Sequence, residues 1–166
     1  ECDAQPDRLA QVRCRGEIVV GTRSDYPPFG QGSGEQARGF EPDLARLLAA
    51  RLGVAPRFVA VSAADRIAAL GEGRVDLIIA TTGHTVQRDG QALFVRPHYY
   101  RSETVVVGQR LPALQGVNRL AALAGHTVCV TVGNATNAEL AVHGARLLLY
   151  ASAGQLVEQV QREIGR

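Results

Sequence analysis

The chain has 166 residues, of which 46% are hydrophobic and 20% are charged, a composition typical of a globular protein with one domain or two small lobes. Its apolar runs are much shorter than the roughly 20 residues that span a bilayer, so we expect no membrane-spanning segment. All 18 basic residues are arginines, the formal net charge is +2, and no run of like charge occurs. This scatter argues against nucleic acid as a partner, because a nucleic-acid-binding surface requires clustered basic residues.

The first half of the chain predicts alternating strands and helices. A β-branched run at residues 18–21 indicates a strand, which leads into a loop rich in Gly, Pro and Ser at 22–34. Apolar residues at helical spacing predict a helix over 41–52, with Pro42 in its first turn and Gly53 after its end. Further along we expect a strand at 57–61, a helix at 63–70 and a buried strand at 75–80.

This alternation, with short connections, is typical of parallel βαβ units. Ligands of such units collect at the carboxyl ends of the strands. Residues 22–29 and 81–88 both follow predicted strands, so we expect the binding loops there.

The second half repeats the pattern on a smaller scale. Residues 104–108 form a strand-like run, and the later elements are a strand at 127–132, a helix near 137–143, a strand at 146–150 and a helix at 153–164. These elements predict a second α/β lobe. A two-stranded sheet has little core of its own, so we expect this lobe to be partial.

The cysteines are odd in number and contain no Cys-x-x-Cys pair, so they indicate neither a zinc ribbon nor a redox dithiol. A disulfide between Cys2 and Cys14 would secure a loose N-terminal arm and would suit an oxidising compartment. Cys129 lies in the apolar run 127–132, which favours a buried core thiol over a nucleophile.

Four segments carry motifs that occur together in one family. Residues 18–29 read Ile-Val-Val-Gly-Thr-Arg-Ser-Asp-Tyr-Pro-Pro-Phe, and residues 39–44 read Gly-Phe-Glu-Pro-Asp-Leu. Within residues 65–99, Asp-Arg-Ile is followed by Gly-Arg-Val-Asp-Leu, Thr-Thr-Gly-His-Thr-Val-Gln-Arg and Phe-x-x-Pro-x-Tyr. Residues 123–133 read Leu-Ala-Gly-His-Thr-Val-Cys-Val-Thr-Val-Gly. In this order the segments resemble the bacterial extracytoplasmic solute-binding proteins of family 3, which serve amino-acid uptake by ABC transporters.

The resemblance implies an α/β, two-lobed periplasmic-binding-protein-like fold of type II, with the first lobe nearly complete and the second partial. In chain order we expect an N-terminal arm at 1–15, a first lobe with the main binding loops at 16–107 and the partial second lobe at 108–166. The lobes would close around the ligand by a hinge at 104–109. No signal peptide is visible and the chain begins at Glu1, so we expect a periplasmic or extracellular protein whose signal peptide has been removed.

The resemblance also assigns a site for the ligand α-carboxylate. Arg88 stands where the family has the arginine that grips this group, and a guanidinium suits it because two parallel N–H bonds fit a carboxylate. Thr81 and Gly83 match positions that offer a hydroxyl and a backbone N–H to the same group. Without the motif, Arg88 reads as a surface arginine after a turn, and Thr81 as the end of a strand.

Arg23 is a departure from many receptors for neutral or basic amino acids, which carry an acidic residue there for the cationic end of the ligand. In this respect the chain is similar to the glutamate/aspartate-binding branch, whose second arginine corresponds to Arg66. Charge-assisted hydrogen bonds contribute roughly 1.5–3 kcal/mol each, so two arginines on one side-chain carboxylate would select an acidic ligand over its amide. The alternative for Arg66 is an exposed helix residue paired with a neighbouring acid.

Four further residues are candidates for the binding cleft. Tyr26 and Phe29 would wall the cleft, although aromatic residues after a Pro-Pro pair also serve to pack loops. Thr131 and Asn134 match positions of the second lobe that close on the ligand from the far side.

One part of the family pattern is missing. Family members continue with a further strand, an acidic residue that meets the ligand ammonium, and a return crossover into the first lobe, whereas this sequence ends at Gly165-Arg166. An ammonium buried opposite arginines without an acidic partner would cost several kcal/mol. Asp25 is the one nearby candidate for that partner. Without a partner, either the affinity for amino acids is weak or the ligand is a carboxylate without an amine.

The leading hypothesis is therefore a binding protein without catalysis or cofactor. It would capture a small carboxylate-bearing solute, in particular an acidic amino acid, and deliver it to an ABC transporter permease or act as the sensor of a membrane receptor.

An enzyme on the same scaffold is the second hypothesis, since some dehydratases and cell-wall-cleaving enzymes resemble these receptors. His84 is its best-placed general acid or base. The four histidines lack metal-ligand spacing, so no metal is expected. A truncated interaction module is the third.

Overall fold

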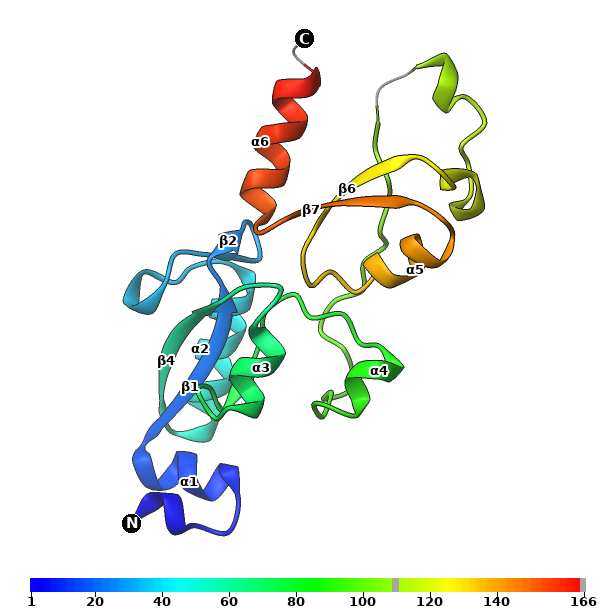
Figure 1. Cartoon of the computed structure of the whole chain (residues 1–166). Coiled ribbons are helices and arrows are strands. Elements are labelled where there is room, and N and C mark those ends of the chain that lie inside the picture. Colours follow the sequence, from blue (N-terminus) through cyan, green and yellow to red (C-terminus); the bar gives the residue numbers. More distant parts are fainter. Residues whose placement is uncertain (109–110, 165–166) are drawn as a thin grey trace. The chain divides into compact units, whose positions relative to one another are not determined.

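Strand β1 (Glu17–Arg23) lies at the centre of the first of two units that the chain forms (Figure 1). The structure is a computed structural model that describes residues 1–108 and 111–164. The units comprise Glu1–Ala92 and Leu93–Arg166. This boundary precedes the 107/108 division expected for the two lobes, and the assignment of the lobes stays a prediction.

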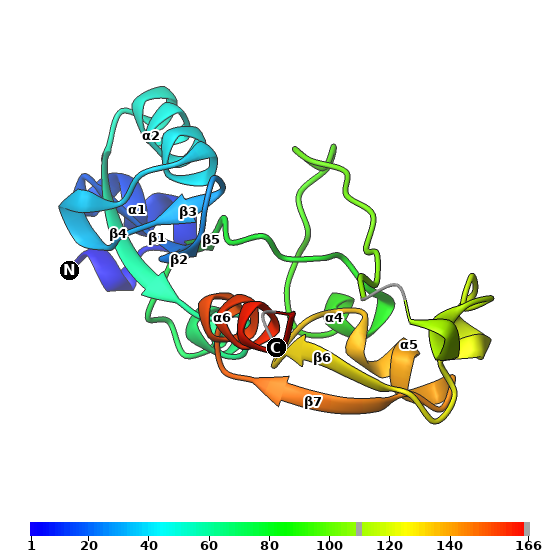
Figure 2. The ribbon, with the colours of Figure 1, turned by 90° about the horizontal axis from the view of Figure 1, so that it is seen from above.

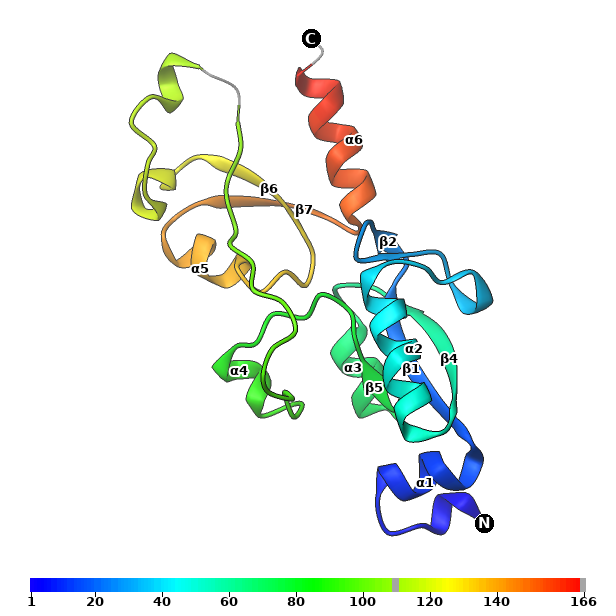
Figure 3. The same cartoon turned by 180° about the vertical axis from the view of Figure 1, so that it is seen from behind.

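The first unit is built on a parallel sheet in the order β4-β1-β5, with β4 at Ala55–Val61 and β5 at Leu77–Ile78. Successive β1 residues point to opposite faces of the sheet, and both faces are covered. Val20 packs in one cluster with Ala45 and Ala49 of α2 (Phe40–Leu52), and Val19 packs in another with Ala69 of α3 (Arg66–Gly71). The two helices therefore cover opposite faces, and Figure 3 shows α2 on the near side of the sheet.

The predicted helix over 41–52 and the strands at 18–21 and 57–61 are confirmed. The strand expected over 75–80 is shorter, because only residues 77–78 pair with β1. The helix expected to begin at residue 63 begins at Arg66.

A side-chain turn accounts for the late start of α3. Asp65 accepts hydrogen bonds from the backbone N–H and the hydroxyl of Ser62, at 2.7 and 2.9 Å. Short polar side chains that bond the nearby backbone in this way compete with helix formation.

The loop after β1 has more structure than its composition predicts. It contains an antiparallel pair, β2 (Asp25–Tyr26) with β3 (Gly30–Gln31), followed by the 3-10 turn η2 (Gly34–Gln36). A four-residue helix, α4 (Val86–Asp89), lies in the segment after β5.

The N-terminal arm is helical rather than loose. It consists of η1 (Cys2–Ala4) and α1 (Arg8–Arg15), which is capped by the Asp7 carboxylate on the Ala10 N–H at 2.8 Å. A disulfide joins Cys2 to Cys14, with 5.5 Å between their Cα atoms. Asp76 binds the arm to the sheet, since its buried carboxylate accepts from Arg15 at 2.7 Å, from Arg8 at 3.3 Å and from the backbone N–H of Val19 at 2.8 Å.

The second unit contains a parallel pair, β6 (Thr127–Thr131) with β7 (Arg146–Tyr150), which Figure 2 shows side by side. Its helices are α5 (Asn137–Val142), α6 (Ala153–Ile164) and the 3-10 turns η3 (Pro112–Leu114) and η4 (Leu120–Leu123). The core consists of Leu123, Val128, Val130, Leu140 and Ala145. The strands and helices expected from 127 onward are confirmed.

Two expectations for this unit are wrong. Residues 104–108 form no strand: they are exposed and carry no ladder pairing, so their β-branched sequence lacks the partner strand it requires. Cys129 is half-buried rather than buried, because it alternates with Val128 and Val130, whose side chains face the core. Residue 109 of the expected hinge lies outside the described residues. Within 1–108 and 111–164, no helix is long and apolar enough to cross a membrane.

Candidate functional site

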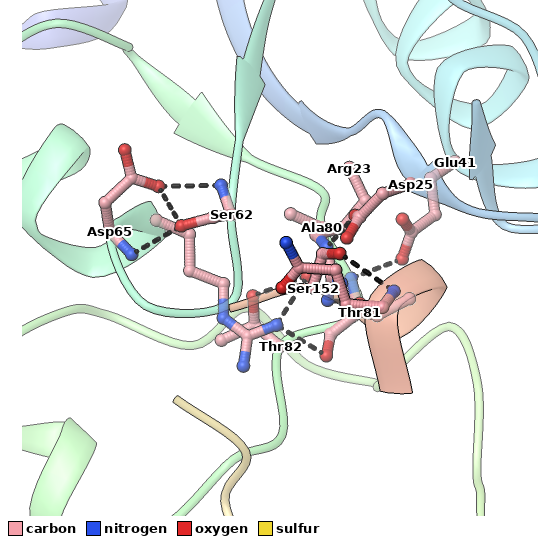
Figure 4. Close-up of polar contacts among 11 residues, drawn as sticks. Arg23, Asp25, Glu41, Ser62, Asp65, Ala80, Thr81, Thr82 and Ser152 are labelled. Atoms are coloured by element: carbon pink, nitrogen blue, oxygen red, sulfur yellow. Dashed lines mark hydrogen bonds and ion pairs between the residues drawn. The ribbon is translucent and has the colours of Figure 1, made fainter. Parts of the chain in front are cut away.

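Three buried charged side chains from three elements converge on the residues that follow β5. Figure 4 labels two of them, Arg23 and Glu41, beside Ala80 and Thr81. Arg23 ends β1, Arg66 begins α3, and Glu41 lies in the first turn of α2; their exposures are 4%, 3% and 0%. All three make hydrogen bonds to residues 80–81. Buried charges are stable only when they are paired and hydrogen-bonded, so these hydrogen bonds are needed to keep the three side chains buried.

Arg23 is held from two sides. Its Nε donates to Asp25 Oδ1 at 2.9 Å, its Nη1 donates to the Thr81 hydroxyl at 3.3 Å, and the guanidinium lies 5.0 Å from the ring centroid of Tyr26. The sequence suggested Asp25 as a partner for a ligand ammonium. In the structure its carboxylate pairs with Arg23.

Arg66 bonds to the backbone. Its Nη1 donates to the carbonyl oxygens of Ala80 at 2.8 Å and Thr81 at 3.0 Å. The alternative that Arg66 is an exposed helix residue is wrong, because the side chain turns inward under the end of the sheet.

Thr81 adopts a left-handed backbone conformation, with φ of 48°, which is uncommon for a residue other than glycine. Its N–H donates to Glu41 Oε1 at 2.5 Å. No local sequence signal marks Glu41 as a site residue, since an acid in the first turn of a helix ordinarily faces solvent and complements the helix dipole.

Arg88 closes the loop that follows Thr81. Thr85 caps the short helix α4 by accepting from the Arg88 N–H at 3.3 Å, and Arg88 Nη1 donates to the Gly83 carbonyl at 2.8 Å. Partial burial lowers the pKa of Arg88, because desolvation disfavours its charged form. In the same loop His84 Nε2 lies 2.6 Å from Asp89 Oδ1.

The loop that carries Tyr26 is anchored to the start of α2. The N–H groups of Phe40 and Glu41 donate to the carbonyls of Pro28 and Phe29, at 3.1 and 2.9 Å. The rings of Tyr26 and Phe29 pack at a tilt of 33° with centroids 6.1 Å apart, and Tyr26 remains 41% exposed.

Thr131 and Asn134 belong to the second unit, where they share the turn after β6. The Thr131 carbonyl accepts from the Asn134 N–H at 3.3 Å and from Asn137 Nδ2 at 2.9 Å. Thr131 is half-buried and Asn134 is exposed.

The described part of the chain holds no group of three or more His, Cys, Asp or Glu side chains arranged for a metal ion. The first unit offers hydrogen-bond donors. Guanidinium groups and a hydroxyl at the carboxyl ends of parallel strands are suited to a carboxylate.

Comparison with known proteins gives two relatives named for amino-acid binding and one named as a lytic murein transglycosylase. The glutamate/glutamine/aspartate/asparagine-binding protein BztA of Rhodobacter capsulatus is 27% identical over 144 residues, which are 83% of this chain and 41% of the relative. The arginine-binding extracellular protein ArtP of Bacillus subtilis is 30% identical over 118 residues, 71% of this chain and 45% of the relative. The membrane-bound lytic murein transglycosylase F of Maricaulis maris is 37% identical over 100 residues, 60% of this chain and 22% of the relative. The matched regions thus span less than half of each of these relatives.

Solved structures share the fold. The ancestral amino-acid-binding protein AncCDT-1, described as a precursor of cyclohexadienyl dehydratase, matches with a TM-score of 0.81 and 25% identity over 94% of this chain and 70% of its own. An L-arginine-bound substrate-binding protein of an amino-acid ABC transporter from Streptococcus pneumoniae matches with a TM-score of 0.77 and 22% identity over 95% and 68%.

The family model for bacterial extracellular solute-binding proteins, family 3, matches residues 18–165. This match covers nearly all of the α/β structure described above and includes every residue assigned to the binding loops. The chain belongs to the family 3 bacterial extracellular solute-binding proteins.

Proposed function

We propose that this chain binds a small amino acid through its carboxylate, at the loops that follow β1 and β5. The observation that carries the proposal is the link between Arg23 and Thr81, because it brings the two loops together at the Thr81 hydroxyl. Arg88, seven residues along the same loop, supplies a partly dehydrated cation for the α-carboxylate. Thr81 and Gly83 precede Arg88 in that loop.

The finer proposal is that the ligand is acidic, and it rests on Arg23. Nη2 of Arg23 makes no hydrogen bond within the part of the chain that the structure describes, so it is the donor left for a side-chain carboxylate. Arg66 contributes less to this preference than the sequence suggested, since its Nη1 is used by two carbonyls. Asp25 pairs with Arg23 at 2.9 Å, and the formal charges of Arg23, Arg66, Asp25 and Glu41 sum to zero.

Isothermal titration with L-glutamate, L-aspartate, L-glutamine and L-asparagine tests both the carboxylate site and the preference for an acidic ligand. We expect binding, with the acids favoured over their amides by about tenfold, the effect of one charge-assisted hydrogen bond. Arg88→Met should abolish binding of all four, and Arg51→Met, at an exposed arginine of α2, should leave it unchanged. Equal affinity for acids and amides would contradict the acidic ligand, and the absence of any binding would contradict the site.

Delivery to an ABC transporter permease from the periplasm or cell exterior is the proposed biological role, with sensing as the alternative. The relatives named for binding support it. Uptake of labelled ligand by cells lacking the gene separates the roles, because loss of uptake indicates transport and unchanged uptake indicates sensing.

A second candidate is catalysis, favoured by the close pairing of His84 with Asp89 and by the transglycosylase among the relatives. A carboxylate that orients an imidazole is a frequent arrangement in general acid–base catalysis. Turnover of murein fragments that disappears in His84→Ala would support this candidate. If the wild type bound its ligand but did not turn over murein fragments, catalysis would be ruled out.

A further inference from the structure

Glu41 is a fully buried carboxylate that links two motifs 40 residues apart. It lies in the first turn of α2, and its Oε1 accepts the Thr81 N–H at 2.5 Å. Removing a carboxylate from water is costly unless hydrogen bonds and opposite charges replace the hydration. A carboxylate buried this completely therefore needs donors from the protein, which an ordinary solvent-exposed helix start does not supply.

The backbone just before Glu41 fixes where its side chain begins. Gly39 has φ of 122°, and a Cβ at this position would lie 2.6 Å from the Phe29 carbonyl oxygen and 2.7 Å from that of Pro28. The two N–H groups that follow donate to these same carbonyls. Only glycine allows this approach, so the Gly-Phe-Glu sequence sets the carboxylate against the end of β5.

Thr81 is the residue that needs to be held. Its left-handed conformation is unfavourable for a β-branched residue and persists only where the surrounding structure holds it in place. Here the N–H is held by Glu41, the carbonyl by Arg66 and the hydroxyl by Arg23. Each polar group of Thr81 thus has a buried charged partner from a different element of the unit.

We propose that Glu41 is a positioning residue for the carboxylate site, which fixes the backbone of Thr81 without touching the ligand. Its oxygen selects the left-handed conformation, and that conformation turns the Thr81 hydroxyl to Arg23 and sets the start of the 81–88 loop. Preorganisation of this kind strengthens binding, because the loop does not have to be ordered by the ligand. The inference deepens the proposed function and rests on it for the identity of the site.

Amide hydrogen exchange in the ligand-free protein tests the contact directly. Glu41→Met keeps the side-chain length and removes the acceptor, whereas Glu41→Gln keeps an acceptor oxygen and removes the charge. Ile79, whose N–H donates to the Gly21 carbonyl at 3.0 Å, serves as the internal control. We expect Thr81 to exchange about tenfold faster relative to Ile79 in Glu41→Met, and to stay within about threefold of the wild type in Glu41→Gln.

Two results would overturn the proposal. One is an unchanged ratio of Thr81 to Ile79 exchange in Glu41→Met, and the other is a Glu41→Gln variant that behaves like Glu41→Met. If Glu41→Met does not fold, the amide proton shift of Thr81 in Glu41→Gln decides: an upfield move from the wild type, caused by the weaker acceptor, supports the proposal, and no move overturns it.

Titration with L-glutamate then connects the contact to binding. We expect affinity to fall at least about tenfold in Glu41→Met and to be restored largely by Glu41→Gln. A wild-type protein that binds no amino acid would remove the proposed function, while the exchange ratio would still show whether Glu41 holds Thr81. Normal affinity in Glu41→Met, with the Thr81 amide released, would overturn the positioning role alone.

Discussion

Arg66 reaches from the start of α3 to the carbonyl of Thr81, 15 residues further along the chain, at 3.0 Å, and the same nitrogen also binds the Ala80 carbonyl at 2.8 Å. A guanidinium under the end of a strand supplies donors to carbonyls that have no ladder partner there. The position at which the family resemblance suggests a ligand residue is, in its described contacts with Ala80 and Thr81, a support for the binding loop.

Replacing Arg66 should therefore lower stability. Arg66→Met removes a buried cation and leaves two carbonyls without this donor, and we expect the free energy of unfolding to fall by about 3 kcal/mol. Urea unfolding followed by circular dichroism measures the change. Arg51→Met, on the exposed side of α2, is the matched control, and an Arg66→Met value within about 0.5 kcal/mol of that control would contradict the supporting role.

Asp25 should tune the charge that Arg23 presents. The 2.9 Å bond between them means that Asp25→Asn removes a competing carboxylate while keeping an oxygen acceptor. On the proposed site, titration should show L-glutamate binding tighter by about tenfold, with little change for L-glutamine. Asp43→Asn is the control, since that carboxylate is 74% exposed and pairs with Arg46. Weaker L-glutamate binding in Asp25→Asn would show that Asp25 positions Arg23 more than it competes.

Asp76 should be the main attachment of the N-terminal arm. Its side chain is 4% exposed and accepts from two arginines and a backbone N–H, so Asp76→Ala leaves several donors unsatisfied and should cost about 3 kcal/mol in urea unfolding. Arg8→Ala should cost less than about 1 kcal/mol, because that arginine is 52% exposed. If Asp76→Ala lowered the unfolding free energy as little as Arg8→Ala, the arm would be held mainly by the apolar contact of Val12.

Two glycines with positive φ should respond differently to alanine. At Gly39 an added Cβ meets two carbonyl oxygens, whereas at Gly53, the end of α2, it meets nothing within 4 Å. Gly53→Ala should cost about 1 kcal/mol in unfolding free energy, and Gly39→Ala at least about 3 kcal/mol with loss of ligand binding. Equal costs would show that the start of α2 can shift to make room.

The Cys2–Cys14 disulfide closes a short loop, with a sequence separation of 12. In the chain-entropy account a loop of this length stabilises by about 3 kcal/mol, provided that the arm unfolds together with its unit. The double variant Cys2→Ser, Cys14→Ser should show this loss in urea. Cys129→Ser, at the half-buried free thiol of β6, is the control, and an unchanged midpoint for the double variant would mean that the arm unfolds separately.

Much of the fold follows from sequence because its signals are local. Helical spacing and flanking glycine place α2 within one residue of the expected start, and apolar β-branched runs place β1 and β4. The prediction of a strand at 104–108 is wrong because a strand forms only with a partner strand, and pairing is not a local property of the sequence. The motif order likewise indicates the family, which the match over residues 18–165 confirms.

The arrangement of the site is decided by tertiary structure. The family resemblance named both Arg23 and Arg66 as donors to a side-chain carboxylate, but their partners separate them: Arg23 bonds to a hydroxyl and a carboxylate, and Arg66 to backbone carbonyls. Glu41 carried no signal, because the cost of burying its charge and the Thr81 N–H that offsets this cost come from segments 40 residues apart. Residue types and spacing determine which groups are available; only the packing of α2, α3 and β5 determines which group each one meets.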